Sequence, residues 1–396
     1  NTTLKINTIT TGNTTTSQLA GGIYATSSSG SINISGGEIK IGTALQAGGG
    51  FGIYASGGNG TAGAINLGTN AITVNQRSGL GIYANNITNI TTGNITAGNT
   101  GVFQNNTSGT GALKTKKITL TGSEDNMIGV YTSGNTTNVE IEGLEMTGLE
   151  KLTGIYVGKG GFKNTGSISI NAGKESYGIY IKGDTGNKTV DFGSAASNIV
   201  LGNESLGLYL DNVNVTGSMP TSITVGDSLA SGKQSVGIYA KDSTFNNTVN
   251  TNVISGKESV GVYFDTNTGN IEYNGNVSLG ENSLGIYKNG GTLKRDPAGS
   301  LAFTGANNMQ STGFYLDNAV LDFTSGALNT STLSMDSGIA FLLKGNTSDV
   351  RVNGVTITPA QLDSLGLAPK VERIVYSEKN ETVTGNIMLD PAVRYY

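Results

Sequence analysis

The sequence contains no cysteine, no histidine and no tryptophan. Without histidine or cysteine, the chain cannot form a Ser-His or Cys-His catalytic dyad, and typical zinc sites are excluded as well. The lack of cysteine also excludes a disulfide scaffold and favours an exported bacterial protein that crosses membranes unfolded. We therefore expect no enzyme, no metal and no cofactor, with carboxylate chemistry as the one catalytic route left open.

Charged residues and proline are scarce too. Charged residues make up 13 % of the 396 residues, and the formal net charge is -4. No basic run stands out, so we expect no nucleic-acid partner. The 5 prolines and 61 glycines show no triplet period, which excludes collagen. No stretch approaches the ~18 apolar residues of a membrane-spanning helix, so no span is expected.

The first residues lack the basic and apolar regions of a signal peptide. We therefore expect a mature or excised part of a larger protein.

A short repeat is present throughout most of the chain. Thirteen copies of a Gly-Ile-Tyr-type motif follow one another, with successive glycines 20 to 30 residues apart and a mean spacing of about 26. The copies begin at Gly22, Gly52, Gly81, Gly101, Gly129, Gly154, Gly178, Gly207, Gly237, Gly261, Gly285 and Gly313, and the last is the degenerate Gly338-Ile339-Ala340.

This period separates the candidate architectures. Helical repeats need long Ala/Leu/Glu/Lys segments, a propeller blade needs ~40 residues, and the leucine-rich pattern is absent. Turn and β-branched residues dominate each copy, which is typical of one coil with two or three short strands. The sequence predicts an all-β parallel β-helix of about 13 coils of roughly 26 residues. Because stacked coils rise by ~4.8 Å, the predicted length is about 60 Å.

The best-preserved copies begin with a polar turn, such as Gly173-Lys174-Glu175-Ser176. Gly and polar residues predict a tight turn that leads into a strand. A second, alternating strand follows, as in Ser167–Ile170. We expect the turn serines to make turn and ladder hydrogen bonds; they are Ser176, Ser205, Ser235, Ser259 and Ser283.

Alternation also orients the motif strand. The residue after Gly is Ile, Val, Leu or Phe, so it should face the core, together with the residues two before and two after it, as in Val236, Ile238 and Ala240. Tyr and Gly would then point outward. In the rival register, Tyr is core and Ile faces outward.

An outward Tyr column is the candidate binding surface. The candidate ligand-binding residues are the later tyrosines and the charged residues two positions after them: Tyr180, Tyr209, Asp211, Tyr239, Lys241, Tyr263, Asp265, Tyr287, Tyr315 and Asp317, with Lys182 in the same charged column. In the functional interpretation, aromatic faces and carboxylates contact a sugar or a protein. In the structural interpretation, the rings stiffen the stack and the charges are a solvated turn that avoids like-charge stacking.

These Gly-Ile-Tyr copies with Gly-Lys-Glu-Ser-Val turns, as at residues 256–260, resemble the passenger regions of large fusobacterial autotransporter adhesins. The resemblance covers roughly residues 15 to 345. It implies a right-handed parallel β-helix, secretion through an outer-membrane barrel of the same protein, display on the bacterial surface, and binding of host cells or other bacteria through a protein or glycan receptor. We expect a monomer.

The C-terminal stretch departs from the repeat. We predict a β-helix repeat region over residues 1–344 and a divergent continuation over 345–396, which is an insertion or a differently sized coil. Thr358 followed by Pro359 is typical of a helix start, so a short helix or loop is expected there. Further strands are expected at Glu372–Tyr376 and Glu381–Leu389.

Two other functions stay open. Parallel β-helices host polysaccharide-cleaving enzymes, and Glu140 and Glu142 lie two apart on a predicted strand, hence on one face. The third possibility is a structural stalk that binds nothing. Protruding loops are expected at the longer spacings, between Gly22 and Gly81 and between Gly178 and Gly237.

Overall fold

The computed structural model describes residues 1–12, 19–184, 188–229, 232–265, 269–304, 310–324, 326–368 and 370–378. It is all-β with about 1% helix, and it forms a right-handed parallel β-solenoid of about 12 turns, which confirms the predicted fold class. The chain divides into two compact units. Unit 1 comprises Asn1–Leu201 and Leu210–Pro220, and unit 2 comprises Gly202–Tyr209 and Thr221–Tyr396. In the ranges that the structure describes, no helix is long and apolar enough to cross a membrane.

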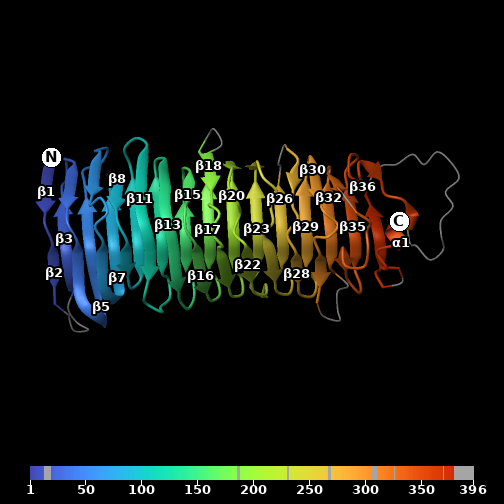
Figure 1. Ribbon diagram of the computed structural model, residues 1–396, viewed down its shortest axis with the longest axis horizontal. Coiled ribbons are helices and arrows are strands. Elements are labelled where there is room, and N and C mark those ends of the chain that lie inside the picture. The colour runs from blue at the N-terminus through green and yellow to red at the C-terminus, as the bar shows by residue number, and fades with distance from the viewer. Residues whose placement is uncertain are drawn as a thin grey trace. The chain divides into compact units, whose positions relative to one another are not determined.

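Each turn contributes to three parallel sheets, which we call the first, second and third sheet. The first sheet carries the Gly-Ile-Tyr motifs. In unit 1 it contains β3 (Leu19–Thr26), β5 (Ile39–Ser56), β7 (Ile72–Asn85), β10 (Thr100–Asn106), β12 (Ile128–Gly134), β14 (Thr153–Val157) and β17 (Tyr177–Lys182) (Figure 1).

The second sheet of unit 1 contains β1 (Thr2–Ile6), β4 (Ile32–Gly36), β6 (Gly63–Asn66), β8 (Ile87–Thr92), β11 (Gly111–Leu120), β13 (Thr137–Thr147), β15 (Phe162–Asn164), β18 (Lys188–Asp191) and β21 (Val213–Val215). The third contains β2 (Ile9–Thr11), β9 (Ile95–Ala97), β16 (Ile168–Ala172) and β19 (Asn198–Leu201). The long strands β5, β7, β11 and β13 each pair in two sheets.

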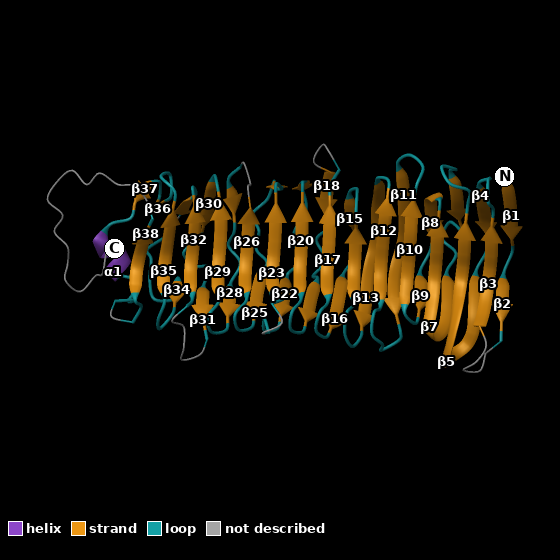
Figure 2. Ribbon diagram, turned by 180° about the vertical axis from the view of Figure 1, so that it is seen from behind, coloured by secondary structure: helices purple, strands orange, loops and turns teal. Residues whose placement is uncertain are grey.

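Unit 2 repeats this arrangement (Figure 2). Its first sheet contains β20 (Leu206–Asp211, whose last two residues belong to unit 1), β23 (Val236–Lys241), β26 (Val260–Asp265), β29 (Leu284–Asn289), β32 (Thr312–Asp317), β35 (Ile339–Lys344) and β38 (Arg373–Ser377). The second contains β27 (Ile271–Glu272), β30 (Thr292–Arg295), β33 (Val320–Phe323), β36 (Asp349–Val352) and β37 (Val355–Thr356). The third contains β22 (Ser222–Val225), β25 (Asn252–Ser255), β28 (Val277–Leu279), β31 (Leu301–Phe303) and β34 (Leu333–Ser334), and the short β24 (Thr244–Phe245) lies between β23 and β25 in the chain.

The motif Ile faces the core and Tyr faces outward, as the preferred register predicts. Ile155 and Ile238 are buried, whereas Tyr156 and Tyr239 are partly exposed. The rival register is therefore wrong.

The prediction that Gly points outward is wrong. A Cβ on Gly154 would overlap the buried Ile170 of the third sheet, and one on Gly81 would lie 2.6 Å from Ile95 Cγ2. Gly and the following Ile are both buried in these copies, so the alternation of inward and outward residues is broken at Gly. For the same reason Val236, predicted to face the core, is half-exposed. Only a residue without a side chain fits where the first sheet approaches the third so closely.

Turn serines are buried and make the predicted turn and ladder hydrogen bonds. Ser283 Oγ accepts a hydrogen bond from the backbone N–H of Ser259 (3.1 Å) and donates to the carbonyl of Glu281 in its own turn (3.1 Å). Ser176 makes the same pair of bonds with Leu152 and Lys174. Each hydroxyl thus joins two coils and closes one turn, so no polar atom of this column is left without a partner at these positions.

The last motif copy lies two residues later than expected. Phe314 and Tyr315 are in register with Phe341 and Leu342 of β35, so the copy is Ala340-Phe341-Leu342 rather than Gly338-Ile339-Ala340. The expected copy was aligned on Gly338, but the pairing follows the core residue Phe341.

The C-terminal segment forms one longer coil. After β36 and the antiparallel β37, the helix α1 (Pro359–Asp363) begins with Thr358 as its N-cap. This confirms the predicted helix start. Strand β38 then pairs parallel with β35 and places Tyr376 beside Leu342, which confirms a strand near residues 372–376. The strand predicted at 381–389 lies outside the described residues, and the division at residue 344 remains a prediction.

Extra residues are present in the long spacing after Gly22. Strand β5 shifts register against β7 between Ile41 and Gly49, and Leu45 in this segment is exposed. In the spacing after Gly178, residues 185–187 and 230–231 lie outside the described part of the chain, and the loop predicted there remains a prediction.

Candidate functional site

The motif aromatics form one ring column in each unit. In unit 1, neighbouring rings lie 4.6 to 5.2 Å apart between centroids, with planes within 14° of parallel; they are Tyr24, Tyr54, Tyr83, Phe103, Tyr131, Tyr156 and Tyr180. In unit 2, Tyr209, Tyr239, Tyr263 and Tyr287 stack at 4.2 to 5.2 Å. Tyr315 meets Tyr287 edge-on at 78°. Tyr180 thus belongs to the column of unit 1, and the other predicted tyrosines to that of unit 2.

Stacking decides which part of each ring a partner can reach. Inside a column, both faces of a ring lie against its neighbours, so edges and hydroxyl groups form the surface. Exposure falls from 68 % for Tyr24 to 8 % for Tyr287. Sugars stack on ring faces, and these are covered here, whereas protein surfaces also pack against ring edges.

A second outward column runs beside the rings, and we call it the flanking column. It is formed by the residue before each motif Gly, which is partly exposed in most copies. In unit 1 these residues are Phe51, Leu80, Thr100, Ile128, Thr153 and Tyr177, and in unit 2 they are Leu206, Val236, Val260, Leu284 and Thr312. The ring and flanking columns together give the first sheet an outer face that carries no charge at these positions. We call this surface the aromatic face.

A polar column follows the rings at the second residue after each aromatic. In unit 1, Asn105 Nδ2 donates to Asn85 Oδ1 (2.9 Å), and Ser133 Oγ donates to Asn105 Oδ1 (3.2 Å). Further along, Lys182 forms an ion pair with Asp211 (3.5 Å). Lys182 and Asp211, which were predicted to lie in one charged column, are therefore brought together.

The polar column of unit 2 contains the remaining predicted charges. Lys241 is in register with Asp265, whose Oδ1 accepts from Asn289 Nδ2 (3.1 Å). Asp317 is in register with Asn289 and forms an ion pair with Lys344 (3.1 Å). This bond to Asp317 raises the pKa of Lys344. Asn289 and Lys344 were missed in the sequence, although they occupy the same offset from Tyr287 and Leu342.

Charges alternate in sign along two further outward columns. In unit 1 the order is Lys114, Glu140, Lys163 and Asp191, and in unit 2 it is Glu272, Lys294, Asp322 and Arg351. Directly opposed like charges would destabilise neighbouring strands. The alternation leaves these columns without a field of one sign, which a polyanionic ligand would require.

Two neighbouring phenols of the ring column of unit 2 have raised pKa values. Burial raises the pKa of Tyr287, and the neighbouring Tyr263 hydroxyl adds to the rise. Burial also raises the pKa of Tyr263, although its hydrogen bond with Tyr287 opposes this. Tyr239 Oη donates to Asp265 Oδ2 (3.4 Å), which links the ring column to the polar column.

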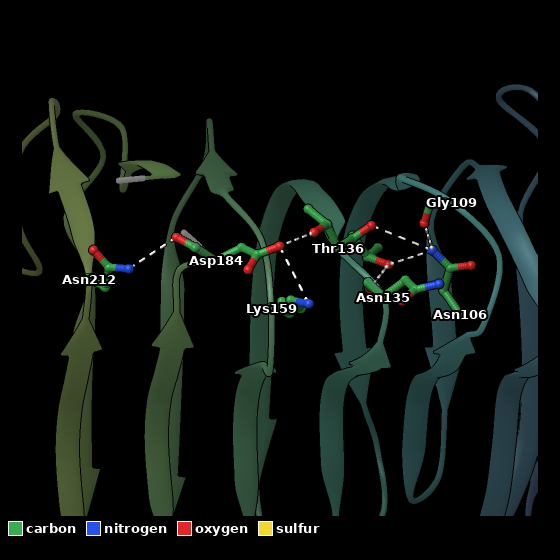
Figure 3. A network of polar contacts seen from close by, with 8 residues as sticks. Asn106, Gly109, Asn135, Thr136, Lys159, Asp184 and Asn212 are labelled. Carbon is green, nitrogen blue, oxygen red and sulfur yellow. Dashed lines mark hydrogen bonds and ion pairs between the residues drawn. The ribbon is translucent and has the colours of Figure 1, made fainter. Parts of the chain in front are cut away.

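A polar network of unit 1 joins the turns between the first and second sheets (Figure 3). Asp184 Oδ2 accepts from Thr136 Oγ1 (2.9 Å) and pairs with Lys159 (3.5 Å). The Asp184 carbonyl accepts from Asn212 Nδ2 (3.0 Å), and Asn106 Nδ2 donates to the Gly109 carbonyl (3.0 Å). The residues of this network lie in the turns of different coils, and their hydrogen bonds and ion pair connect those coils.

Two cations lie inside unit 2, where sequence reasoning placed none. Lys288 occupies an inward position and donates to the turn carbonyls of Asn289 and Gly290, and burial lowers its pKa to about 8. Arg295 donates to the carbonyls of Tyr273 (3.1 Å) and of Gly275 and Ser300 (3.0 Å each). Burial lowers its pKa to about 10.

Carboxylates do not gather in the part of the chain that the structure describes: it holds no group of three or more acidic residues placed to bind a metal ion. Glu140 pairs with Lys114 (3.4 Å), and Glu142 is exposed on the same strand.

Comparison with known proteins returned no matching family model, no matching curated protein and no matching solved structure.

Proposed function

We propose that this chain is a passenger segment of a bacterial autotransporter adhesin, displayed at the surface of the outer membrane, and that it binds a receptor on a host cell or another bacterium. The aromatic face carries this proposal. In each unit it is an uncharged surface of tyrosine edges and mostly aliphatic flanking side chains, and tyrosine is enriched where proteins bind one another.

The order within the ring column supports binding by this face. Side chains that are ordered on association cost about 0.5–1.5 kcal/mol each. The rings of Tyr239 and Tyr263 are already held between neighbours at 5.2, 5.0 and 4.2 Å, so little rotamer freedom is left to lose. Such a preordered surface favours a protein receptor, because the covered ring faces offer little to a sugar.

Alternating charges argue against a polyanionic receptor, and the scattered carboxylates argue against a polysaccharide-cleaving site. One observation favours the stalk alternative. Within each column, the rings already stack on one another and the polar side chains already form hydrogen bonds or ion pairs with one another. A binding test separates these two.

The purified chain is incubated with epithelial cells, immune cells and other bacteria, and bound protein is quantified. A variant with Tyr239→Thr and Tyr263→Thr removes two adjacent rings while keeping strand-forming residues. The matched control is Ile254→Thr, an outward position of the third sheet that is 52 % exposed. Loss of two central contacts should weaken binding about tenfold or more.

The control should bind like the unchanged chain. Binding that survives the double substitution would move the site to the loops. If the chain binds none of these cells while a longer piece of its parent protein does, the segment is a stalk.

A further inference from the structure

The oxidisable side chains of this protein are of few kinds. Because the chain has no Cys, Trp or His, its most readily oxidised side chains are those of 16 Tyr, which lose an electron, and 6 Met, which take up oxygen. Met127, Met146 and Met335 are at most 2 % exposed. The motif tyrosines, in contrast, present their edges and hydroxyl groups to solvent. A one-electron oxidant at the described surface therefore meets phenols and the partly exposed Met219.

The ring column of unit 1 places these phenols in contact. Tyr131, Tyr156 and Tyr180 stack at 4.6 and 4.7 Å, and the strands that carry them are paired in register. Near-parallel rings translated by one coil have matching ortho carbons opposite one another. Burial raises the pKa of Tyr156, and Tyr180 and Tyr131 add to the rise, as expected when the phenol oxygens also lie close together.

We propose that the ring column of unit 1 is a site of oxidative coupling, in which tyrosines of adjacent coils join through a carbon–carbon bond between their ortho positions. The oxidant is a peroxide acting with a peroxidase. Each of two phenols gives up one electron and its hydroxyl proton, and the two phenoxyl radicals combine. The coupled rings recover their aromatic form by moving the ortho hydrogens to oxygen. One peroxide is reduced to two waters for each bond.

The bond would act in this stack as a disulfide does in other proteins, because it would add a covalent cross-link between side chains of adjacent coils, which otherwise interact through hydrogen bonds, ion pairs and packing. It is an inference separate from receptor binding and does not depend on it.

Phe103 supplies an internal boundary. It stacks between Tyr83 (5.2 Å) and Tyr131 (4.8 Å) but has no hydroxyl and forms no phenoxyl radical. Phe103 therefore divides coupling in the column of unit 1 into two segments, Tyr24–Tyr54–Tyr83 and Tyr131–Tyr156–Tyr180. Tyr177 is the comparison residue: it is 49 % exposed, but it stands in the flanking column beside Thr153.

In the test, a dilute solution of the chain (residues 1–396) is treated with hydrogen peroxide and a haem peroxidase. Dityrosine fluorescence follows the reaction, and peptide mass spectrometry locates each bond. We expect intramolecular bonds within the two segments and none between Tyr83 and Tyr131. Circular dichroism before oxidation establishes that each variant is folded.

Two variants make the expectation specific. Tyr156→Phe keeps the stack but should abolish both bonds of the second segment while leaving the first unchanged. Phe103→Tyr should add bonds to Tyr83 and Tyr131. The proposal is overturned if fluorescence does not develop, if Tyr156→Phe leaves the bond map unchanged, or if Tyr177 bonds between molecules account for the yield.

Discussion

Replacing Gly237 by Ala tests the inward position of the motif glycine. A Cβ at this position would overlap Cγ1 of Val253, which is buried in the third sheet, and would lie 2.6 Å from the carbonyl oxygen of Gly261 in the next coil. The valine methyl cannot leave without opening the core, and the carbonyl is fixed by strand pairing. Overpacking of a tight core costs about 1–3 kcal/mol, and two fixed neighbours place this substitution at the upper end, about 3 kcal/mol.

The assay is urea unfolding at fixed pH, read as a lower midpoint with an unchanged slope. Gly269→Ala is the matched control in the same unit, because a Cβ there has no neighbour within 4 Å. It should change stability by no more than about 0.5 kcal/mol. Equal effects of the two substitutions would refute the inward placement of Gly237.

Two further predictions concern buried polar groups of unit 2. The pKa of Lys288 is about 8 in the folded chain, against an ordinary value of 10.5. As the pH rises, the folded chain therefore loses this proton before the unfolded chain does. Below pH 8, the cost of burying the charged ammonium group lowers the free energy of unfolding by a constant amount. Between about pH 8 and 10.5, the free energy of unfolding should rise by up to about 3 kcal/mol. Lys288→Met should remove this rise and stabilise the chain at pH 7, as urea unfolding at several pH values would measure; the same pH slope in both proteins would contradict it. Ser283→Ala would leave the N–H of Ser259 and the carbonyl of Glu281 without this hydroxyl and should cost about 1–3 kcal/mol. The half-buried outward Ser278→Ala should cost far less by the same assay, and a similar loss would argue against the internal ladder.

Much of the architecture follows from the sequence, because each coil repeats the same physical problem. The period of about 26 residues and the invariant apolar residue after Gly predict stacked coils, inward Ile and outward Tyr. The serine ladder follows as well, since a short hydroxyl side chain in a tight turn reaches both its own turn and the next coil.

The errors have local causes. Simple alternation placed Gly237 outward and Val236 inward, but Gly237 and Ile238 are both buried, and a strict two-residue period does not represent two consecutive buried residues. The last copy was aligned on Gly338 because glycine was taken as the marker, whereas strand pairing follows the buried Phe341.

The buried cations could not be predicted from the pattern. Lys288 occupies the inward position that Ala240 and Phe264 fill in earlier coils, so its offset from the motif was a signal. Its burial depends, however, on turn carbonyls that the sequence does not locate. The polar column was half predicted: the offset from Tyr identified Asp265 and Asp317, but amides such as Asn289 were overlooked because only charges were considered.

Site-directed thiol labelling tests the central claim most directly, which is that each coil turns its Ile inward and its Tyr outward. Because the chain has no cysteine, a single introduced thiol is an unambiguous reporter. Ile238→Cys and Tyr239→Cys are compared under native conditions with a small thiol reagent. The account predicts rapid labelling at 239 and strong protection at 238, with both positions reactive after unfolding in urea. Equal native rates, or protection at 239 with labelling at 238, would contradict it.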